Sequence, residues 1–262
     1  MPKIKTILVT GSSGQLGLSL KAIAKNYPDV MFTFATRPNL DLSREQSIDD
    51  YFQQHDFDLV INCAAYTAVD KAESEPELAD QINHLAVKQL ADIAKHQNIK
   101  LIHISTDYVF NGQHYRPYIE TDDVEPKSVY GETKLKGEQA LITTLPNNGL
   151  IIRTSWLYSE FGNNFVKTML RLGQERDSLN VIFDQVGTPT YAHDLAQVIM
   201  MIVASNTFSQ EQVTTELYHY SNEGVCSWYD FAKTIFELAN IDCKVSPIET
   251  KDYPTLATRP HY

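Results

Sequence analysis

Thr10-Gly11-Ser12-Ser13-Gly14-Gln15-Leu16-Gly17 is the stretch of sequence that decides the fold of this chain. An apolar run at 4–10, typical of a buried strand, leads into it, and an amphipathic stretch at 15–25, typical of a helix, follows it. Gly11, Gly14 and Gly17 permit a tight turn and let backbone N–H groups approach a pyrophosphate at the positive end of the helix dipole. We therefore predict a strand-turn-helix unit that binds a dinucleotide.

The alternation of strand-like and helix-like segments continues through the first half of the chain. Apolar runs rich in Ile, Val and Leu are separated by stretches with helical periodicity, and the sequence then predicts one more helix and one more strand. In chain order these segments are 31–36, 43–54, 59–63, 77–96, 101–105, 128–145 and 149–154. This rhythm predicts an α/β fold with a doubly wound parallel sheet of the Rossmann type, covered by helices on both faces.

The second half of the chain is patterned more loosely. It contains helix-like stretches at 193–204 and 228–240, and Ser227 is placed to cap the second of these. We predict a dinucleotide-binding domain at 1–155 and a smaller, mainly substrate-binding C-terminal lobe at 156–262, with some later segments returning to the first domain.

Composition excludes several classes of function. The chain of 262 residues has 22 Lys and Arg against 33 Asp and Glu, so its net charge of -11 opposes binding to nucleic acid or to anionic membranes. Cys63, Cys226 and Cys243 have no metal-ligand spacing, so we expect neither a disulfide framework nor a cysteine metal site. We see no export signal and no apolar stretch near the roughly 20 residues of a membrane span, and we expect a cytoplasmic protein.

The end of the second predicted strand bears on the choice of dinucleotide. NAD-specific sites place an acidic residue there, whereas this chain has Thr36 and Arg37. A hydroxyl and a cation suit a 2′-phosphate better, so we expect NADPH to bind at least as well as NADH. The alternative is that Arg37 is only a solvated surface charge.

Tyr130-Gly131-Glu132-Thr133-Lys134 carries the predicted catalytic pair. On a helix the tyrosine and the lysine, at i and i+4, share one face. A free tyrosine has a pKa of about 10, so a nearby ammonium is needed to favour the phenolate and make proton transfer accessible. Lys134 fits this role and could also hold the nicotinamide ribose. The alternative is an ordinary pair on a surface helix.

A third group is needed to hydrogen-bond a carbonyl oxygen that becomes negative as a hydride arrives. Thr106 is our candidate, because it ends the apolar strand at 101–105, at the sheet edge where doubly wound folds bind ligands. Ser105 is the competitor, and strand alternation allows only one of the two side chains to point into the site.

Several segments together resemble the dTDP-4-dehydrorhamnose reductase family of the extended short-chain dehydrogenase/reductase superfamily, whose shifted GxxGxxG turn this chain shares. The resemblance spans nearly the whole chain, and the segments that carry it most clearly are 60–73, 105–112, 130–138, 153–158 and 184–190. It implies the NAD(P)H-dependent reduction of the 4-keto group of dTDP-4-dehydro-L-rhamnose to give dTDP-L-rhamnose, in the biosynthesis of that nucleotide sugar.

The resemblance also implies roles for individual residues. It places Gly14, Gln15 and Leu16 at the pyrophosphate of the cofactor. It places Asp41 and Leu42 at the adenine, and Ala64, Ala65 and Tyr66 at the ribose and nicotinamide. Thr106, Asp107 and Trp156 would contact the sugar. The alternatives are an ordinary core aromatic for Trp156 and a turn residue for Asp107.

The chain departs from the family in two places. Some relatives are magnesium-bridged dimers, but the corresponding neighbourhoods here contain Ser19 and His193, so we predict no metal site and expect a monomer or a weak homodimer. The chain stops at Arg259-Pro260-His261-Tyr262, where relatives continue, so we expect part of the family's C-terminal segment to be absent.

Two other functions remain alternatives. A nucleotide-sugar epimerase or dehydratase uses the same Tyr-Lys pair but retains NAD, and Asp107 beside Thr106 is compatible with a dehydratase. A non-catalytic regulatory subunit of the methionine adenosyltransferase type shares the fold but has no need of Thr106, Tyr130 and Lys134.

Overall fold

The larger part of the molecule is built on one sheet. The computed structural model describes residues 4–210 and 212–262, and within them six strands form a sheet in the order β10-β5-β4-β3-β1-β2, with every neighbouring pair parallel. In chain order the strands are β1 (Thr6–Thr10), β2 (Met31–Phe34), β3 (Leu59–Asn62), β4 (Lys100–Thr106), β5 (Gly149–Thr154) and β10 (Glu216–His219). The predicted doubly wound parallel sheet is confirmed.

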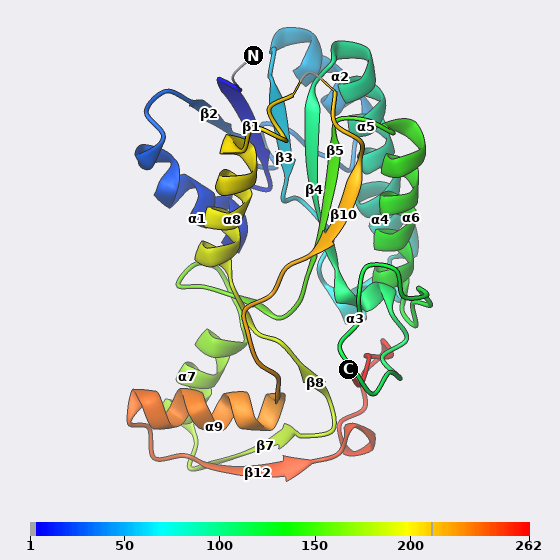
Figure 1. The fold of residues 1–262 in the computed structure, drawn as a ribbon. Helices are drawn as coiled ribbons and strands as arrows, with labels where there is room; N and C mark the ends of the chain where they lie inside the picture. The colour runs from blue at the N-terminus through cyan, green and yellow to red at the C-terminus, as the bar shows by residue number, and fades with distance from the viewer. Residues whose placement is uncertain (1–3, 211) are drawn as a thin grey trace.

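Helices cover both faces of this sheet (Figure 1). On one face lie α1 (Gln15–Ile23) and α8 (Ala192–Ala204), and on the other lie α2 (Glu45–Gln54), α5 (Ala86–Gln97) and α6 (Val129–Thr144). The single helix expected at 77–96 is divided, because a π-helical turn separates α4 from α5. The short elements on this side are α3 (Val69–Ala72), α4 (Pro76–Asp80) and the π-helical turn Gln81–Leu85.

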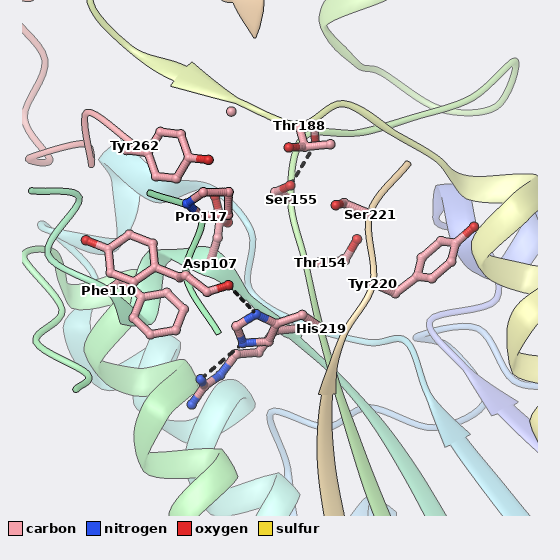
Figure 2. Close-up of a pocket in the computed structure, with 13 residues that line it drawn as sticks. Asp107, Phe110, Pro117, Thr154, Ser155, Thr188, His219, Tyr220, Ser221 and Tyr262 are labelled. Atoms are coloured by element: carbon pink, nitrogen blue, oxygen red, sulfur yellow. Dashed lines mark hydrogen bonds between the residues drawn. The ribbon is translucent and has the colours of Figure 1, made fainter. Parts of the chain in front are cut away.

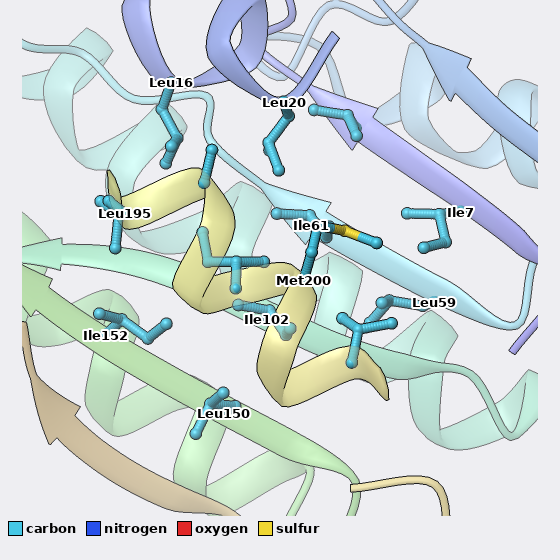
Figure 3. Close-up of a cluster of buried hydrophobic side chains, with 14 of the residues drawn as sticks. Ile7, Leu16, Leu20, Leu59, Ile61, Ile102, Leu150, Ile152, Leu195 and Met200 are labelled. Atoms are coloured by element: carbon cyan, nitrogen blue, oxygen red, sulfur yellow. The ribbon is translucent and has the colours of Figure 1, made fainter. Parts of the chain in front are cut away.

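The core under α8 shows why the sheet has two apolar faces. Leu195 and Met200 of α8 pack with Leu20 of α1 on Ile61 and Ile102 of the sheet, and all five side chains are buried (Figure 3). Each fully buried aliphatic side chain of this kind stabilises the fold by about 1.5–3 kcal/mol relative to an exposed one. The sheet face under α8 is therefore covered by apolar side chains.

A smaller lobe lies beyond the carboxyl ends of the strands, at the bottom of Figure 1. Its elements are α7 (Phe165–Glu175), α9 (Trp228–Ala239) and the parallel pair β7 (Ser178–Ile182) and β12 (Lys244–Ile248). The predicted Ser227 cap is present, with Asp230 completing a capping box. The lobe has its own apolar cluster, separate from the two clusters of the sheet.

The chain passes between the two parts more than once. Although they come late in the sequence, β10 pairs with β5 and α8 packs on α1. Two-residue strands lie along these crossings, namely β6 (Leu157–Tyr158), β8 (Val186–Gly187), β9 (Thr190–Tyr191) and β11 (Cys226–Ser227). Among the helices of the described ranges, none has the length and apolarity that crossing a bilayer requires.

Candidate active site

One cleft collects nearly all of the predicted site residues. It has a volume of about 860 Å³ and lies where the central strands end and the lobe begins. The predicted residues that line it are Gly11, Gly14, Gln15, Leu16, Gly17, Arg37, Asp41, Leu42, Ala64, Ala65, Tyr66, Thr106, Asp107, Tyr130, Lys134 and Trp156. Thr36 is the one predicted residue that does not line it. This is the edge at which doubly wound sheets bind ligands.

The glycine turn lines the cleft at the point where α1 begins. Gly11 has a left-handed φ of +60°, and a Cβ there would lie 2.7 Å from the Ala64 nitrogen, so only glycine fits. Gly14 is the N-cap of α1, and no side chain of the described residues caps that helix. Its first-turn N–H groups therefore suit an anion, which is what a dinucleotide pyrophosphate would supply.

The end of β2 is arranged differently from the sequence-based expectation. The Thr36 hydroxyl donates to Asn39 Oδ1 at 2.7 Å instead of facing the cleft. Arg37 does line the cleft, with 69% of its side chain exposed and its Nε 3.4 Å from Asp41 Oδ1. The Arg37 guanidinium is therefore a solvent-exposed cation beside Asp41 at this edge of the cleft.

Thr106 and Ser105 diverge as strand alternation requires. Thr106 donates to Asp107 Oδ1 at 3.0 Å, and its hydroxyl is close enough to Tyr130 to lower the pKa of that phenol. Ser105 donates instead to Glu138, which is buried in an ion pair with Arg153 whose closest N–O distance is 2.6 Å. The structure thus brings Thr106, and not Ser105, to the phenol.

Tyr130 and Lys134 sit on the first turns of α6, whose N-cap Ser128 accepts from the Gly131 N–H at 3.2 Å. Burial raises the pKa of Tyr130 to about 12, with the Thr106 hydrogen bond opposing the shift, so the phenol is protonated at neutral pH. Burial lowers the pKa of Lys134 to about 8. The protein as described therefore holds a phenol that carries its proton at neutral pH.

Asp107 opens a 3₁₀ turn (Asp107–Val109) directly after β4. Burial raises the pKa of its carboxyl to about 6, with hydrogen bonds from Thr106 and Tyr108 opposing the shift. A carboxyl in this state can accept or donate a hydrogen bond near neutral pH.

Trp156 stands where the chain leaves the sheet for the lobe. Its φ of +46° is a left-handed conformation that is rare for a bulky residue, and its indole stacks on Trp228 of α9 with ring centroids 3.4 Å apart. Gly187 leaves room for this ring, since a Cβ there would lie 2.6 Å from Trp156 Cε2. The alternative of an ordinary core aromatic does not describe a strained residue that lines a cleft.

The side chain of Gln15 ties the phosphate-binding turn to the start of the lobe. Its amide nitrogen donates to the Leu157 carbonyl at 3.1 Å. Its amide oxygen accepts from Ser159 at 3.0 Å and from Asn164 at 2.8 Å. The same residue thus belongs to both walls of the cleft.

A second cavity of about 150 Å³ adjoins the cleft (Figure 2). Asp107, Thr154 and Ser155 line both cavities. Arg153 and His219 come from β5 and β10, and in Figure 2 His219 lies on the side opposite Tyr262. The cavity widens the space next to the predicted catalytic residues.

Ser19 and His193, the two residues that made us predict no metal site, have well-defined surroundings. Ser19 is buried and donates to the Gln15 carbonyl at 2.9 Å, while the ring of His193 lies against Tyr191. Within the described ranges, no cluster of three His, Cys, Asp or Glu side chains is arranged to hold a metal.

Some residues of the site were not found by sequence reasoning. Trp228 was assigned only to a helix, and its position beneath Trp156 depends on how the lobe folds back. His103 interrupts an otherwise apolar strand, Leu101-Ile102-His103-Ile104, and it is fully buried. A histidine in such a strand was a usable signal, because buried polar groups need partners.

The chain is similar in sequence to one family of known proteins along nearly its whole length. The family model described as RmlD substrate binding domain matches residues 5–262. A dTDP-4-dehydrorhamnose reductase of Sinorhizobium fredii is 43% identical over 258 residues, which are 97% of this chain and 86% of the relative.

Solved structures agree with these matches. A dTDP-4-dehydrorhamnose reductase of Clostridium acetobutylicum has a TM-score of 0.92 at 42% identity, covering 98% of this chain and 88% of that one. A Bacillus anthracis dTDP-4-dehydrorhamnose reductase in complex with NADP has a TM-score of 0.91 at 39% identity, covering 100% of this chain and 89% of that one. The predicted family is confirmed.

Proposed function

Because the chain belongs to the dTDP-4-dehydrorhamnose reductase family, we propose that it reduces the 4-keto group of dTDP-4-dehydro-L-rhamnose to dTDP-L-rhamnose, with NADPH as the preferred cofactor and NADH as a possible one. The observation that carries the proposal is one continuous cleft. Its one end is the uncapped glycine turn, and its other end holds Thr106, Tyr130 and Lys134. The family assignment weighs against an epimerase, a dehydratase or a regulatory subunit.

The residues divide the chemistry among themselves. When bound, the reduced nicotinamide supplies a hydride to the carbonyl carbon of the sugar. Tyr130 gives its proton to the carbonyl oxygen, which becomes the hydroxyl of the product. Thr106 donates a hydrogen bond to that oxygen as it gains charge. Lys134, when protonated, stabilises the phenolate that Tyr130 leaves and holds the nicotinamide ribose.

The other residues of the cleft bind the cofactor and the sugar. The N–H groups at the start of α1, in the turn that contains Gly14, receive the pyrophosphate, and Arg37 receives the 2′-phosphate. Trp156 supports the sugar ring. We assign residues 1–155 mainly to the cofactor and 156–262 mainly to the substrate, and place the protein in the cytoplasm as a monomer or weak homodimer.

A direct assay tests the function. Purified protein is mixed with NADPH and freshly prepared dTDP-4-dehydro-L-rhamnose, and the absorbance of the reduced nicotinamide is followed. We expect loss of absorbance only when the sugar is present, with one NADPH consumed for each dTDP-L-rhamnose formed. Conversion of the sugar with no net consumption of NADPH would instead indicate an epimerase or dehydratase.

A further inference from the structure

A buried row of polar side chains runs across the middle of the sheet. Register places Thr10 of β1 opposite Asn62 of β3, and Asn62 opposite His103 of β4. Thr10 is 1% exposed, and Asn62 and His103 are 0% exposed. The row ends at Lys134 of α6, which is 1% exposed. Thr10, Asn62 and His103 are shielded from solvent, so their polar groups must satisfy one another or Lys134, which lines the cleft.

The hydrogen bonds orient the Asn62 amide. Its Oδ1 accepts from the Thr10 hydroxyl at 2.6 Å and from the Ala64 N–H at 3.2 Å. The Ala64 N–H is shared with Thr10 Oγ1, 3.3 Å away, and a flipped amide would place the Nδ2 donor against that N–H, so the oxygen faces Ala64. The Nδ2 group is thereby turned to His103 Nδ1, 3.0 Å away.

This orientation determines the tautomer of the histidine. An amide nitrogen is a donor, so His103 Nδ1 must accept from it, and a neutral imidazole then carries its proton on Nε2. The imidazole is neutral because burial, and next the charge of Lys134, hold its pKa well below the usual value. Its Nε2 lies 3.2 Å from Lys134 Nζ, which also donates to the Ile104 carbonyl at 2.6 Å.

We propose that His103 is a positioning residue for Lys134: Asn62 fixes the imidazole in the tautomer that points its Nε2–H at the lysine nitrogen. The neutral amine of Lys134 can accept a hydrogen bond from this Nε2–H. The ammonium form has only N–H donors, so it would bring two donors together. His103 therefore holds Lys134 in place while favouring its neutral form. Burial lowers the Lys134 pKa, and the Nε2–H of His103 adds to that lowering.

The other groups around Lys134 cannot take over this role. Glu138 on its own helix raises the pKa of Lys134, but that carboxylate is already committed to Arg153. The Cys63 thiol lies at the end of β3, and burial raises its pKa to about 12, so it stays neutral. The neutral phenol of Tyr130 lines the same cleft.

The tautomer is tested on the unaltered protein. With ¹⁵N-labelled histidine, the two ring nitrogens are distinguished by their chemical shifts, and the His103 signals are assigned as those lost in His103→Phe. We expect the Nε2-protonated tautomer with no titration across the folded pH range. A His103 signal that shows protonation on Nδ1 overturns the proposal. If His103→Phe does not fold, the histidine that does not titrate is read in its place.

The coupling to Lys134 is tested with ¹³C-labelled lysine. The chemical shift of the carbon next to Nζ is followed against pH, and the Lys134 signal is assigned as the one lost in Lys134→Met. In His103→Phe we expect the Lys134 pKa to rise by about one unit, because a hydrogen-bond donor that opposed the ammonium is removed. A fall in the Lys134 pKa, which loss of an acceptor would cause, or no change, overturns the proposal.

Lys100→Met is the matched control. Lys100 is buried and hydrogen-bonded like Lys134, but it lies at the start of β4, at the end of the strand away from the cleft. It should leave the Lys134 pKa unchanged. The effect on catalysis rests on the proposed function: the alkaline fall in kcat should move to higher pH in His103→Phe. Absence of reductase activity in the unaltered protein and in every variant would refute the proposed function. The change in the Lys134 pKa measured by NMR would still decide the role of His103.

Discussion

The sheet and the lobe hold their parts of the cleft in different ways. On the sheet side, polar groups such as Thr106, Glu138 and Lys134 are buried and hydrogen-bonded to neighbouring strands and helices. On the lobe side, the wall depends on the stack of Trp156 on Trp228 and on strands of two residues. The groups assigned to chemistry are thus on the rigid side, and the groups assigned to recognition are on the adaptable one.

This difference follows from what each task needs. Proton transfer tolerates little displacement of the reacting groups, so they belong on elements fixed by packing. Binding a sugar ring through an aromatic face tolerates more, because dispersion and apolar contact are not strongly directional. Substitutions on the two sides should therefore fail in different ways.

Tyr130→Phe should have the largest effect. It removes the transferable proton but keeps the ring, so we expect kcat to fall by about 10³-fold while NADPH still binds. Single-turnover kinetics and a cofactor titration measure the two separately. A kcat within a few-fold of the unaltered protein would remove Tyr130 from the chemistry.

Glu138→Leu should destabilise the sheet side most. Arg153 donates to Glu138 from Nε at 2.9 Å and from Nη2 at 2.6 Å, and loss of the carboxylate leaves a buried guanidinium unpaired. We expect a loss of about 3–5 kcal/mol in the free energy of unfolding, measured by urea denaturation. The control is Glu132→Leu on the same helix, which breaks an exposed pair with Lys136 and should cost less than about 1 kcal/mol.

Gly187→Ala should disturb the lobe side without affecting the sheet. The added methyl would overlap the Trp156 indole and displace it from the stack. Overpacking costs about 1–3 kcal/mol, so the KM for the nucleotide sugar should rise by at least about five-fold. The KM for NADPH should not change; an equal rise in both constants would show that the two sides are not separable.

Arg37→Glu should have the smallest effect, because the side chain is mostly exposed and screened by solvent. A carboxylate near the 2′-phosphate should raise the KM for NADPH a few-fold more than that for NADH. Steady-state kinetics with both cofactors measures the ratio. Equal changes in the two values would place Arg37 outside the cofactor site.

The sequence predicted the sheet side well and the lobe side poorly, for physical reasons. The glycine turn and the Tyr130–Lys134 spacing are local signals, so their positions on α1 and α6 could be inferred from neighbouring residues. The stack of Trp156 on Trp228 joins residues distant in the chain, and no local periodicity encodes it. The Thr36 hydroxyl bond to Asn39 and the Lys134 contact with the Ile104 carbonyl depend on side-chain directions that propensities do not specify.

Trp156 and Trp228 are the only tryptophans in the chain. All of its indole fluorescence therefore originates at the junction between the sheet and the lobe, from two rings in face-to-face contact. Any ligand that parts the rings or shields them changes the emission of the whole protein. The intrinsic tryptophan fluorescence of the protein therefore reports on the proposed sugar-binding wall of the cleft, and no added label is needed.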